Sequence, residues 1–369
     1  MSYDTLIVGA GFAGATMARL LADAGQRVLV IDKRDHIGGN AYDYANEDGI
    51  RVHRYGPHIF HTNSDHVFEW LSRFTEWRRY EHRVLASVDG KLVPFPVNID
   101  TLEALGLEHL KPPPEADAHP ANAEDQCLQR VGPELYELFF KGYTQKMWGK
   151  HPRELDASVT ARIPIRWGSR DDRYFTDKHQ AMPRDGYTAM FDRMLGHPGI
   201  EVRTSLPMPQ LRYKNSENFP SQFMGRQFRR LVWTGPIDEY FGHRFGRLPY
   251  RSMRFDLSLA STNACGAATI NYPDAETPWT RETQWALIGG SDDAMTPVTT
   301  EYPCEEGDPY YPIPCPEARA LYKRYEALAD AEPGVTFLGR LGRYQYLNMD
   351  QVVGQAMAAF AKMSANPAR

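Results

Sequence analysis

Cysteine is scarce in this 369-residue chain: there are four, at positions 127, 265, 304 and 315, and no two of them form a C-x-x-C pair. This number and spacing exclude a zinc ribbon and a disulfide-stapled secreted scaffold, and they indicate a reducing, cytoplasmic environment. The chain also lacks an uncharged apolar run of about 18 residues and a basic N-terminal segment followed by an apolar one. We therefore expect neither a membrane span nor an export signal.

An excess of positive charge is absent too. The chain has 42 Lys and Arg against 47 Asp and Glu, a formal net charge of −5, and 42% of its residues are hydrophobic. This balance gives no general attraction to nucleic acid or to an anionic membrane, and the composition excludes a disordered chain. The length indicates two domains or one elaborate α/β unit with a full hydrophobic core. Any polyanion must therefore be bound in a local pocket.

The first forty residues carry the sharpest motif. An aliphatic run from Asp4 to Val8 predicts a buried strand, the fingerprint Gly9-Ala10-Gly11-Phe12-Ala13-Gly14 follows it, and small residues at 15–24 predict a helix. A second predicted strand, 28–31, ends at Asp32. The first glycine permits a tight turn, the second lets the backbone approach a pyrophosphate, and the third allows close helix packing. With Asp32 placed to bind ribose hydroxyls, the pattern predicts a dinucleotide site.

The fingerprint alone does not distinguish NAD from FAD, but three further features favour FAD. The fingerprint lies at the start of the chain, a second glycine pair at 38–39 follows Asp32, and a Gly-Arg segment at 339–344 precedes a predicted helix. The N-terminus of that helix, near Asn348, would face the flavin carbonyls with its positive dipole end.

In the rest of the chain, the sequence pattern changes twice. Residues 78–190 contain helical stretches interrupted by proline, with helices expected at 102–110 and 135–147. Later, alternating runs predict strands, and longer amphipathic runs predict helices. The expected strands are 229–233, 267–272, 283–288 and 335–338, and the expected helices are 315–328 and 349–363.

These patterns predict an α/β fold: an FAD-binding Rossmann-like domain with an inserted helical domain and an antiparallel β-sheet domain. The discontinuous FAD-binding domain would comprise residues 1–77, 190–240 and 330–369. The helical insertion would span 78–190, and the antiparallel substrate region would span 241–329.

Histidines, aromatic residues and arginines are concentrated in a few segments. His58 and His61 stand three apart within Tyr55–Thr62, but no third ligand accompanies them, so we expect no metal site. Aromatic residues around Tyr143 and Trp148 precede Arg162. Arginine guanidinium groups donate paired hydrogen bonds to phosphate, and aromatic rings stack on a nucleobase. An ordinary aromatic core with surface arginines fits the same spacing equally well. No serine elbow or Cys-His nucleophile signature is present, so any chemistry is expected to belong to the cofactor.

These residues resemble the bacterial UDP-galactopyranose mutases, and the ordered matches cover most of the chain. The matching motifs include I-G-G-N at 37–40, Y-G-P-H-I-F-H-T at 55–62, F-F-K-G-Y-T-Q-K-M-W-G at 139–149, D-D-R-Y-F at 171–175, G-D-P-Y-Y-P at 307–312 and Y-Q-Y-L-N-M-D at 344–350. The resemblance implies interconversion of UDP-galactopyranose and UDP-galactofuranose by ring contraction, with N5 of reduced FAD as covalent nucleophile at the anomeric carbon. It also implies a place in galactofuranose supply for the bacterial cell wall.

The resemblance implies roles for particular residues. Catalytic roles are implied for Arg162, Arg281, His58 and His61. Substrate contacts are implied for Phe139, Tyr143, Trp148, Arg162, Tyr174, Arg281, Tyr311, Tyr346 and Asn348. Cofactor contacts are implied for Gly9, Gly11, Phe12, Gly14, Asp32, Lys33, Gly39, Asn40, His58, His61, Arg340, Tyr346, Asn348 and Met349. Among these, Arg162 and Arg281 would bind the diphosphate, and Trp148 with Tyr143 would contact the uridine. Arg251 is expected to approach the flavin or the sugar.

The family also implies partners and motion. A reductant, NAD(P)H or another donor, would reduce the FAD; a mobile loop after Trp148 would close over the nucleotide; and two or more copies would form a homodimer or higher homo-oligomer. Asn348 departs from the family pattern, since many members have an aspartate there, and segments 256–266 and 282–297 match poorly.

Two other functions fit the same motifs. One is a redox flavoenzyme of the amine oxidase type, because one fold serves many chemistries. The other is a catalytically silent relative that binds nucleotide sugars.

Overall fold

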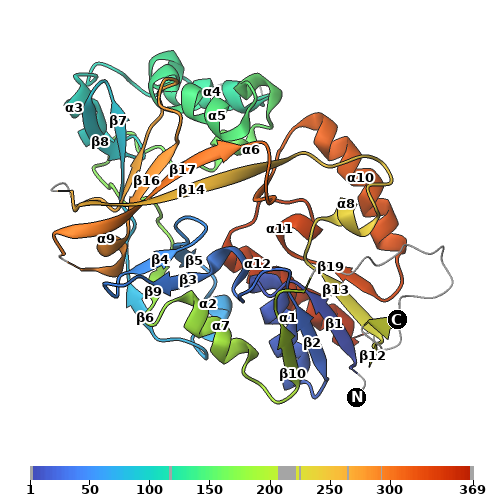
Figure 1. The fold of residues 1–369 in the computed structure, drawn as a ribbon. Coiled ribbons are helices and arrows are strands. Elements are labelled where there is room, and N and C mark those ends of the chain that lie inside the picture. The colour runs from blue at the N-terminus through green and yellow to red at the C-terminus, as the bar shows by residue number, and fades with distance from the viewer. Residues whose placement is uncertain are drawn as a thin grey trace.

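Two large sheets organise the chain (Figure 1). The structure is a computed structural model that describes residues 3–115, 119–206, 222–223, 226–263, 266–291 and 293–365, so Cys265 lies outside the described residues. A five-stranded sheet has the order β10-β2-β1-β13-β19, and a seven-stranded sheet has the order β18-β14-β17-β16-β15-β7-β8. The predicted fold class, a Rossmann-like α/β domain combined with a helical region and an antiparallel sheet, is confirmed.

The five-stranded sheet is parallel throughout. Its strands are β1 (Thr5–Val8), β2 (Val28–Ile31), β10 (Ile200–Arg203), β13 (Arg230–Trp233) and β19 (Val335–Phe337). Every residue of β1 and β2 is buried, because both faces of a parallel sheet are covered by other elements. Ile7 and Val30 pack in the same cluster as helices α1 (Phe12–Asp23) and α12 (Met349–Ala365), whereas Leu6 and Leu29 pack with α10 (Pro316–Ala331).

The turn from β1 into α1 depends on close backbone approach. Gly9 has φ +104, and a Cβ at Gly14 would lie 1.9 Å from the Gly9 carbonyl oxygen. The first conformation favours glycine, and the second contact excludes every larger residue. The helix starts at Phe12, earlier than predicted, because Gly11 is an extended N-cap. This turn places the first amides of α1 above the carboxyl end of β1.

The seven-stranded sheet is antiparallel except where β15 pairs with β7. Its strands are β7 (Val84–Val88), β8 (Lys91–Phe95), β14 (Tyr250–Ser261), β15 (Thr269–Asn271), β16 (Arg281–Gln284), β17 (Met295–Cys304) and β18 (Tyr311–Pro312). β7 and β8 thus join this sheet from within the segment 78–190. The division into domains stays a prediction.

Helices gather at the end of this sheet shown at the top of Figure 1. They are α3 (Ile99–Leu105), α4 (Ala123–Leu135), the π-helix η2 (Tyr136–Lys141), α5 (Gly142–Trp148) and α6 (Ser158–Ala161). The helix predicted at 102–110 ends at Leu105, because Gly106 adopts φ +74 and closes it. The helix predicted at 135–147 is present as η2 and α5, and such π-helical turns are frequent at functional sites.

Smaller elements connect these layers. The strands are β3 (Asp43–Ala45), β4 (Arg51–His53), β5 (Phe60–Thr62), β6 (Trp77–Arg79), β9 (His179–Pro183), β11 (Gln222–Phe223) and β12 (Arg226–Gln227). The helices are η1 (Gly39–Ala41), α2 (Asp65–Leu71), η3 (Pro152–Glu154), α7 (Tyr187–Leu195), α8 (Ile237–Tyr240), α9 (Trp285–Gly289) and α11 (Gly339–Gly342). None of the described helices has the length and apolarity needed to cross a bilayer.

The strand predicted at 283–288 is wrong. β16 ends at Gln284 and the helix α9 follows. The Trp285 ring is buried and its Nε1 donates to Thr299 Oγ1 at 2.8 Å, while the Ala286 amide donates to Thr296 Oγ1 at 2.9 Å. A short apolar run fits a buried helix as well as a strand, and side-chain partners on β17 decide the outcome here. The other predicted strands and helices are present, with ends shifted by a few residues.

Candidate functional site

A trough lies at the carboxyl ends of β1 and β2, where open α/β sheets bind their ligands. Ten of the residues predicted to contact the cofactor line it: Gly9, Gly11, Phe12, Asp32, Lys33, Gly39, Asn40, His58, Arg340 and Met349. Gly14 is not in the wall, because it packs α1 against the β1 turn instead. The trough therefore gathers residues from both ends of the chain.

The trough offers the groups that a dinucleotide needs. At Gly11 a Cβ would meet only the backbone of Gly39, at 3.6 Å or more, so the bare backbone there is open toward the trough. The first amides of α1 have no helical partner and attract phosphate. Asp32 is 8% exposed and accepts hydrogen bonds from the amides of Ala10, at 2.8 Å, and Arg34, at 2.9 Å. These contacts hold its carboxylate beside the position expected for a ribose.

A second cavity, of about 480 Å³, adjoins the trough and shares His58, Arg340 and Met349 with it. Its volume is in the range of small-molecule sites. The predicted residues that line it are His58, His61, Phe139, Tyr143, Arg162, Tyr174, Arg281, Arg340, Tyr346, Tyr311, Asn348 and Met349. The structure therefore brings most of the predicted substrate residues around one space, directly beside the trough.

Arginines and tyrosines alternate along one wall of this cavity. The rings of Tyr311 and Tyr346 are stacked, 5.7 Å apart, and the guanidinium of Arg162 lies 4.0 Å from the centre of the Tyr346 ring. Arg340 lies 4.8 Å from the same ring. Burial raises the pKa of the Tyr346 phenol, but Arg162, Arg340 and Arg281 outweigh that effect and leave the pKa below its ordinary value. The wall is thus strongly electropositive and suits a phosphate group.

Arg281 has a buried acidic partner, Glu301. The two residues are directly opposite each other on β16 and β17, and Arg281 Nε lies 3.2 Å from Glu301 Oε1. Burial raises the pKa of the Glu301 carboxyl, and the Arg281 guanidinium opposes that rise. Glu301 was not among the predicted site residues, because the cross-strand register that creates the pair has no local sequence signal.

Two predicted contacts lie outside both spaces. Trp148 is 3% exposed and packs edge-on against Tyr311, at 6.2 Å, rather than lining the cavity. Arg251 lines neither space: its Nε donates to the Met147 carbonyl at 2.9 Å and its Nη2 to the Lys146 carbonyl at 3.1 Å. The expectation that Arg251 approaches the flavin or the sugar is therefore wrong. Its charge stabilises the carboxyl end of α5.

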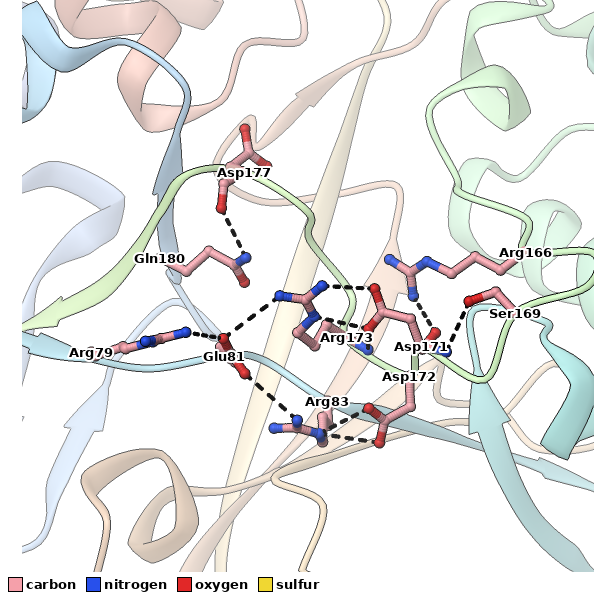
Figure 2. Close-up of polar contacts among 10 residues, drawn as sticks. All are labelled: Arg79, Glu81, Arg83, Arg166, Ser169, Asp171, Asp172, Arg173, Asp177 and Gln180. Atoms are coloured by element: carbon pink, nitrogen blue, oxygen red, sulfur yellow. Dashed lines mark hydrogen bonds and ion pairs between the residues drawn. The ribbon is translucent and has the colours of Figure 1, made fainter.

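The segment that carries Tyr174 is fixed from the outside by an ion-pair network, which Figure 2 shows. Arg173 pairs with Asp171 at 2.8 Å and with Glu81 at 3.7 Å, and Arg83 pairs with Asp172 at 3.0 Å. The Tyr174 amide also donates to the His82 carbonyl at 2.7 Å. Exposed pairs contribute little singly, but together with this backbone contact they hold the segment against β7.

Other cavity residues were not predicted from the sequence. They include His82, Thr144, Met147, Phe175, Asp177, Asn271 and Glu301. His82 precedes β7 and Asn271 is the last residue of β15, and the pairing of β7 with β15 brings them to the same space. Among the residues that the structure describes, no three His, Cys, Asp or Glu side chains form a metal-binding group.

Buried histidines give the fold a defined pH response. Burial lowers the pKa of His53, His58 and His82 to about 3. The unfolded chain binds these protons near pH 6.5 and the folded chain does not, so the free energy of unfolding must fall as the pH drops below about 6.5. The slope is about 1.4 kcal/mol per pH unit for each such histidine.

His53 allows this prediction to be tested, because it is 2% exposed and lines neither the trough nor the cavity. Urea unfolding between about pH 7 and pH 5 is expected to show a shallower slope for His53→Gln than for the wild type, by about 1 kcal/mol per pH unit on average. Equal slopes in the two proteins would contradict a neutral, buried His53.

The chain matches two family models, UDP-galactopyranose mutase over residues 138–346 and an NAD(P)-binding Rossmann-like domain over residues 7–74. A Klebsiella pneumoniae protein named "Probable UDP-galactopyranose mutase" is 37% identical, over 96% of this chain and 93% of its own. The dTDP-fucopyranose mutase of Escherichia coli is 35% identical, over 95% and 96% of the two chains. A crystal structure of reduced UDP-galactopyranose mutase superposes with a TM-score of 0.77 at 16% identity, covering 99% and 94% of the two chains, which shows a shared fold.

Proposed function

Because the chain belongs to the UDP-galactopyranose mutase family and is thus an isomerase, we propose that it interconverts UDP-galactopyranose and UDP-galactofuranose by ring contraction. One observation carries the proposal: the arginine- and tyrosine-lined cavity meets the dinucleotide trough at His58, Arg340 and Met349. A sugar attached to a diphosphate held in the cavity would therefore lie against the inner end of a cofactor held in the trough.

FAD is the proposed cofactor, and the trough residues fit it. Gly11 leaves room for the pyrophosphate, Asp32 stands at the ribose position, and Met349 at the N-terminus of α12 lies where the two spaces join. When bound and reduced, FAD supplies through N5 the covalent nucleophile for the anomeric carbon. The protein must hold substrate and cofactor together and keep water out.

The cavity residues divide this work among them. Arg162 and Arg281 are proposed to bind the diphosphate, because forked donors stabilise the charge that grows on UDP as its bond to the sugar breaks. Tyr174, Tyr311 and Tyr346 line the same cavity. Phe139 and Tyr143 also line the cavity and are proposed to contact the uracil ring.

Arg162 is also proposed to help close the cavity. It lies in the segment between α6 and Tyr174, and its guanidinium covers the Tyr346 ring. This segment is proposed to be the family's mobile loop, in its closed position. Four further properties stay predictions. They are the reductant (NAD(P)H or another donor), the assembly into a homodimer, the cytoplasmic location and the role in galactofuranose supply.

Chromatography of reaction products tests the proposal. Purified protein is incubated with UDP-galactofuranose, with and without dithionite, and in a parallel arm with dTDP-fucofuranose, because one relative is a dTDP-fucopyranose mutase. Conversion of UDP-galactofuranose by the reduced protein alone is the expected result. Conversion of only the dTDP sugar would show that the substrate is a dTDP sugar and not UDP-galactofuranose. Bleaching of oxidised flavin together with formation of an oxidised product would identify a redox enzyme. UDP binding without turnover would identify a silent relative.

A further inference from the structure

The His61 side chain is held by the carboxylate of Asp177, which follows Tyr174 in the sequence. His61 Nδ1 and Asp177 Oδ2 are 3.0 Å apart, and the two side chains are only 13% and 23% exposed. The other carboxylate oxygen of Asp177 accepts a hydrogen bond from Asn63 Nδ2 at 3.0 Å. Its backbone carbonyl accepts from Gln180 Nε2, also at 3.0 Å (Figure 2). Asp177 is therefore fixed at three points.

The His61 ring is fixed on its face as well. It stacks on Phe175 with ring centres 3.7 Å apart and an angle of 14° between the planes. Both Phe175 and Asp177 lie just after Tyr174, so the segment that carries a cavity tyrosine also clamps His61. All four residues line the cavity. These contacts leave the imidazole one orientation in the cavity wall.

The hydrogen bond also determines which ring nitrogen carries the proton. An ionised carboxylate only accepts hydrogen bonds, so Nδ1 must be the donor in this pair. Among the described residues, Nε2 of His61 has no hydrogen-bond partner. In the neutral ring, Nε2 is then an acceptor that remains available to a molecule in the cavity.

We propose that Asp177 is a positioning residue: it orients His61 and holds the tautomer protonated on Nδ1, so that Nε2 accepts a hydrogen bond from a hydroxyl or N–H group bound in the cavity. Within the proposed function, that group is a sugar hydroxyl or the reduced cofactor. Carboxylates orient histidines in this way in many sites, and where the histidine binds a metal their loss typically costs about 10- to 100-fold, which we take as the scale here.

The chain contains a matched control for this dyad. His179 Nε2 lies 2.7 Å from Asp65 Oδ1, and the His179 ring stacks on Phe68 with centres 4.0 Å apart. This pair lies next to the first one: His179 is on β9, opposite Thr62 of β5, and Asp65 is the first residue of α2. Asp65 is 55% exposed, however, and neither residue lines the cavity. Asp65→Asn thus repeats the chemical change of Asp177→Asn outside the site.

Two readouts on the holoenzyme test the proposal. The first is the tautomer, from ring ¹⁵N chemical shifts of histidine-labelled protein with His61 assigned through His61→Gln. We expect a proton on Nδ1 in the wild type and in Asp65→Asn, and a changed or mixed tautomer in Asp177→Asn. The second is turnover of UDP-galactofuranose: Asp177→Asn is expected to lower kcat by about 10- to 100-fold. Its affinity for UDP, and the kcat of Asp65→Asn, should stay within about twofold of wild type.

An unchanged His61 tautomer in Asp177→Asn would overturn the proposal, as would equal losses of turnover in the two variants. Because the ¹⁵N readout needs no substrate, it remains decisive if the wild type fails to convert UDP-galactofuranose. Failure of the proposed function is thereby distinguished from failure of the Asp177 assignment.

Discussion

Arg281→Ala is expected to lower turnover by about 10²- to 10³-fold, because it removes one of two arginines proposed to stabilise the departing diphosphate. It also leaves Glu301, which is 2% exposed, without its cationic partner. Breaking a buried ion pair by removing one member costs about 3–5 kcal/mol. The variant should therefore lose both activity and stability, measured by steady-state kinetics and urea unfolding.

A double variant separates these two effects. Arg281→Ala combined with Glu301→Gln removes the stranded charge, so the free energy of unfolding should recover most of the loss while turnover stays low. Arg281→Lys, which keeps the charge but loses the fork, should fall between wild type and alanine in turnover. Recovery of turnover in the double variant would show that Arg281 serves the fold rather than the reaction.

Gly11→Ala is expected to weaken FAD binding by at least about tenfold, or about 1.4 kcal/mol, while leaving the protein folded. Gly11 has φ −82, which alanine adopts freely, and the added Cβ would approach no protein atom closer than 3.6 Å. The methyl group would instead occupy the part of the trough where the backbone approaches a pyrophosphate. Flavin absorbance per protein after gel filtration measures the loss.

Gly14→Ala is the control variant that separates a loss of protein stability from a loss of FAD binding. Its Cβ would lie 1.9 Å from the Gly9 carbonyl oxygen, so this variant should lower the melting temperature of the protein even without cofactor. Gly11→Ala should leave that melting temperature unchanged. Wild-type FAD affinity in Gly11→Ala would show that the cofactor phosphates do not approach the start of α1.

The parts of the fold that could be predicted from sequence are the ones determined by neighbouring residues. The succession of β1, the glycine turn, α1 and β2 is specified within the first thirty-two residues, because buried strands and a small-residue helix have distinct periodicities. The apolar run that begins at Trp285 is ambiguous by the same criterion. It forms a helix because its backbone and side chain find partners on β17.

The candidate site, too, could be predicted only in part, because contacts between residues far apart in the sequence have no local signal. Arg281 and Arg162 could be named because the family resemblance implies their roles, whereas Glu301 faces Arg281 only through the register of β16 with β17. His61 and Asp177 are 116 residues apart in sequence, and no periodicity relates them. The contacts of Arg251 were predicted wrongly for a related reason. A long side chain can reach many partners, and only the folded chain brings it to the carbonyl groups at the carboxyl end of α5.

The most direct test of this account asks whether the chemistry depends on the cofactor atom proposed to carry it. The protein is stripped of flavin, reloaded with FAD or with 5-deaza-FAD, in which carbon replaces N5, and assayed in the reduced form with UDP-galactofuranose. The account predicts that both forms bind UDP equally well and that only the FAD form yields UDP-galactopyranose. Comparable conversion by the 5-deaza-FAD form would contradict it and would place the reaction on the side chains of the cavity.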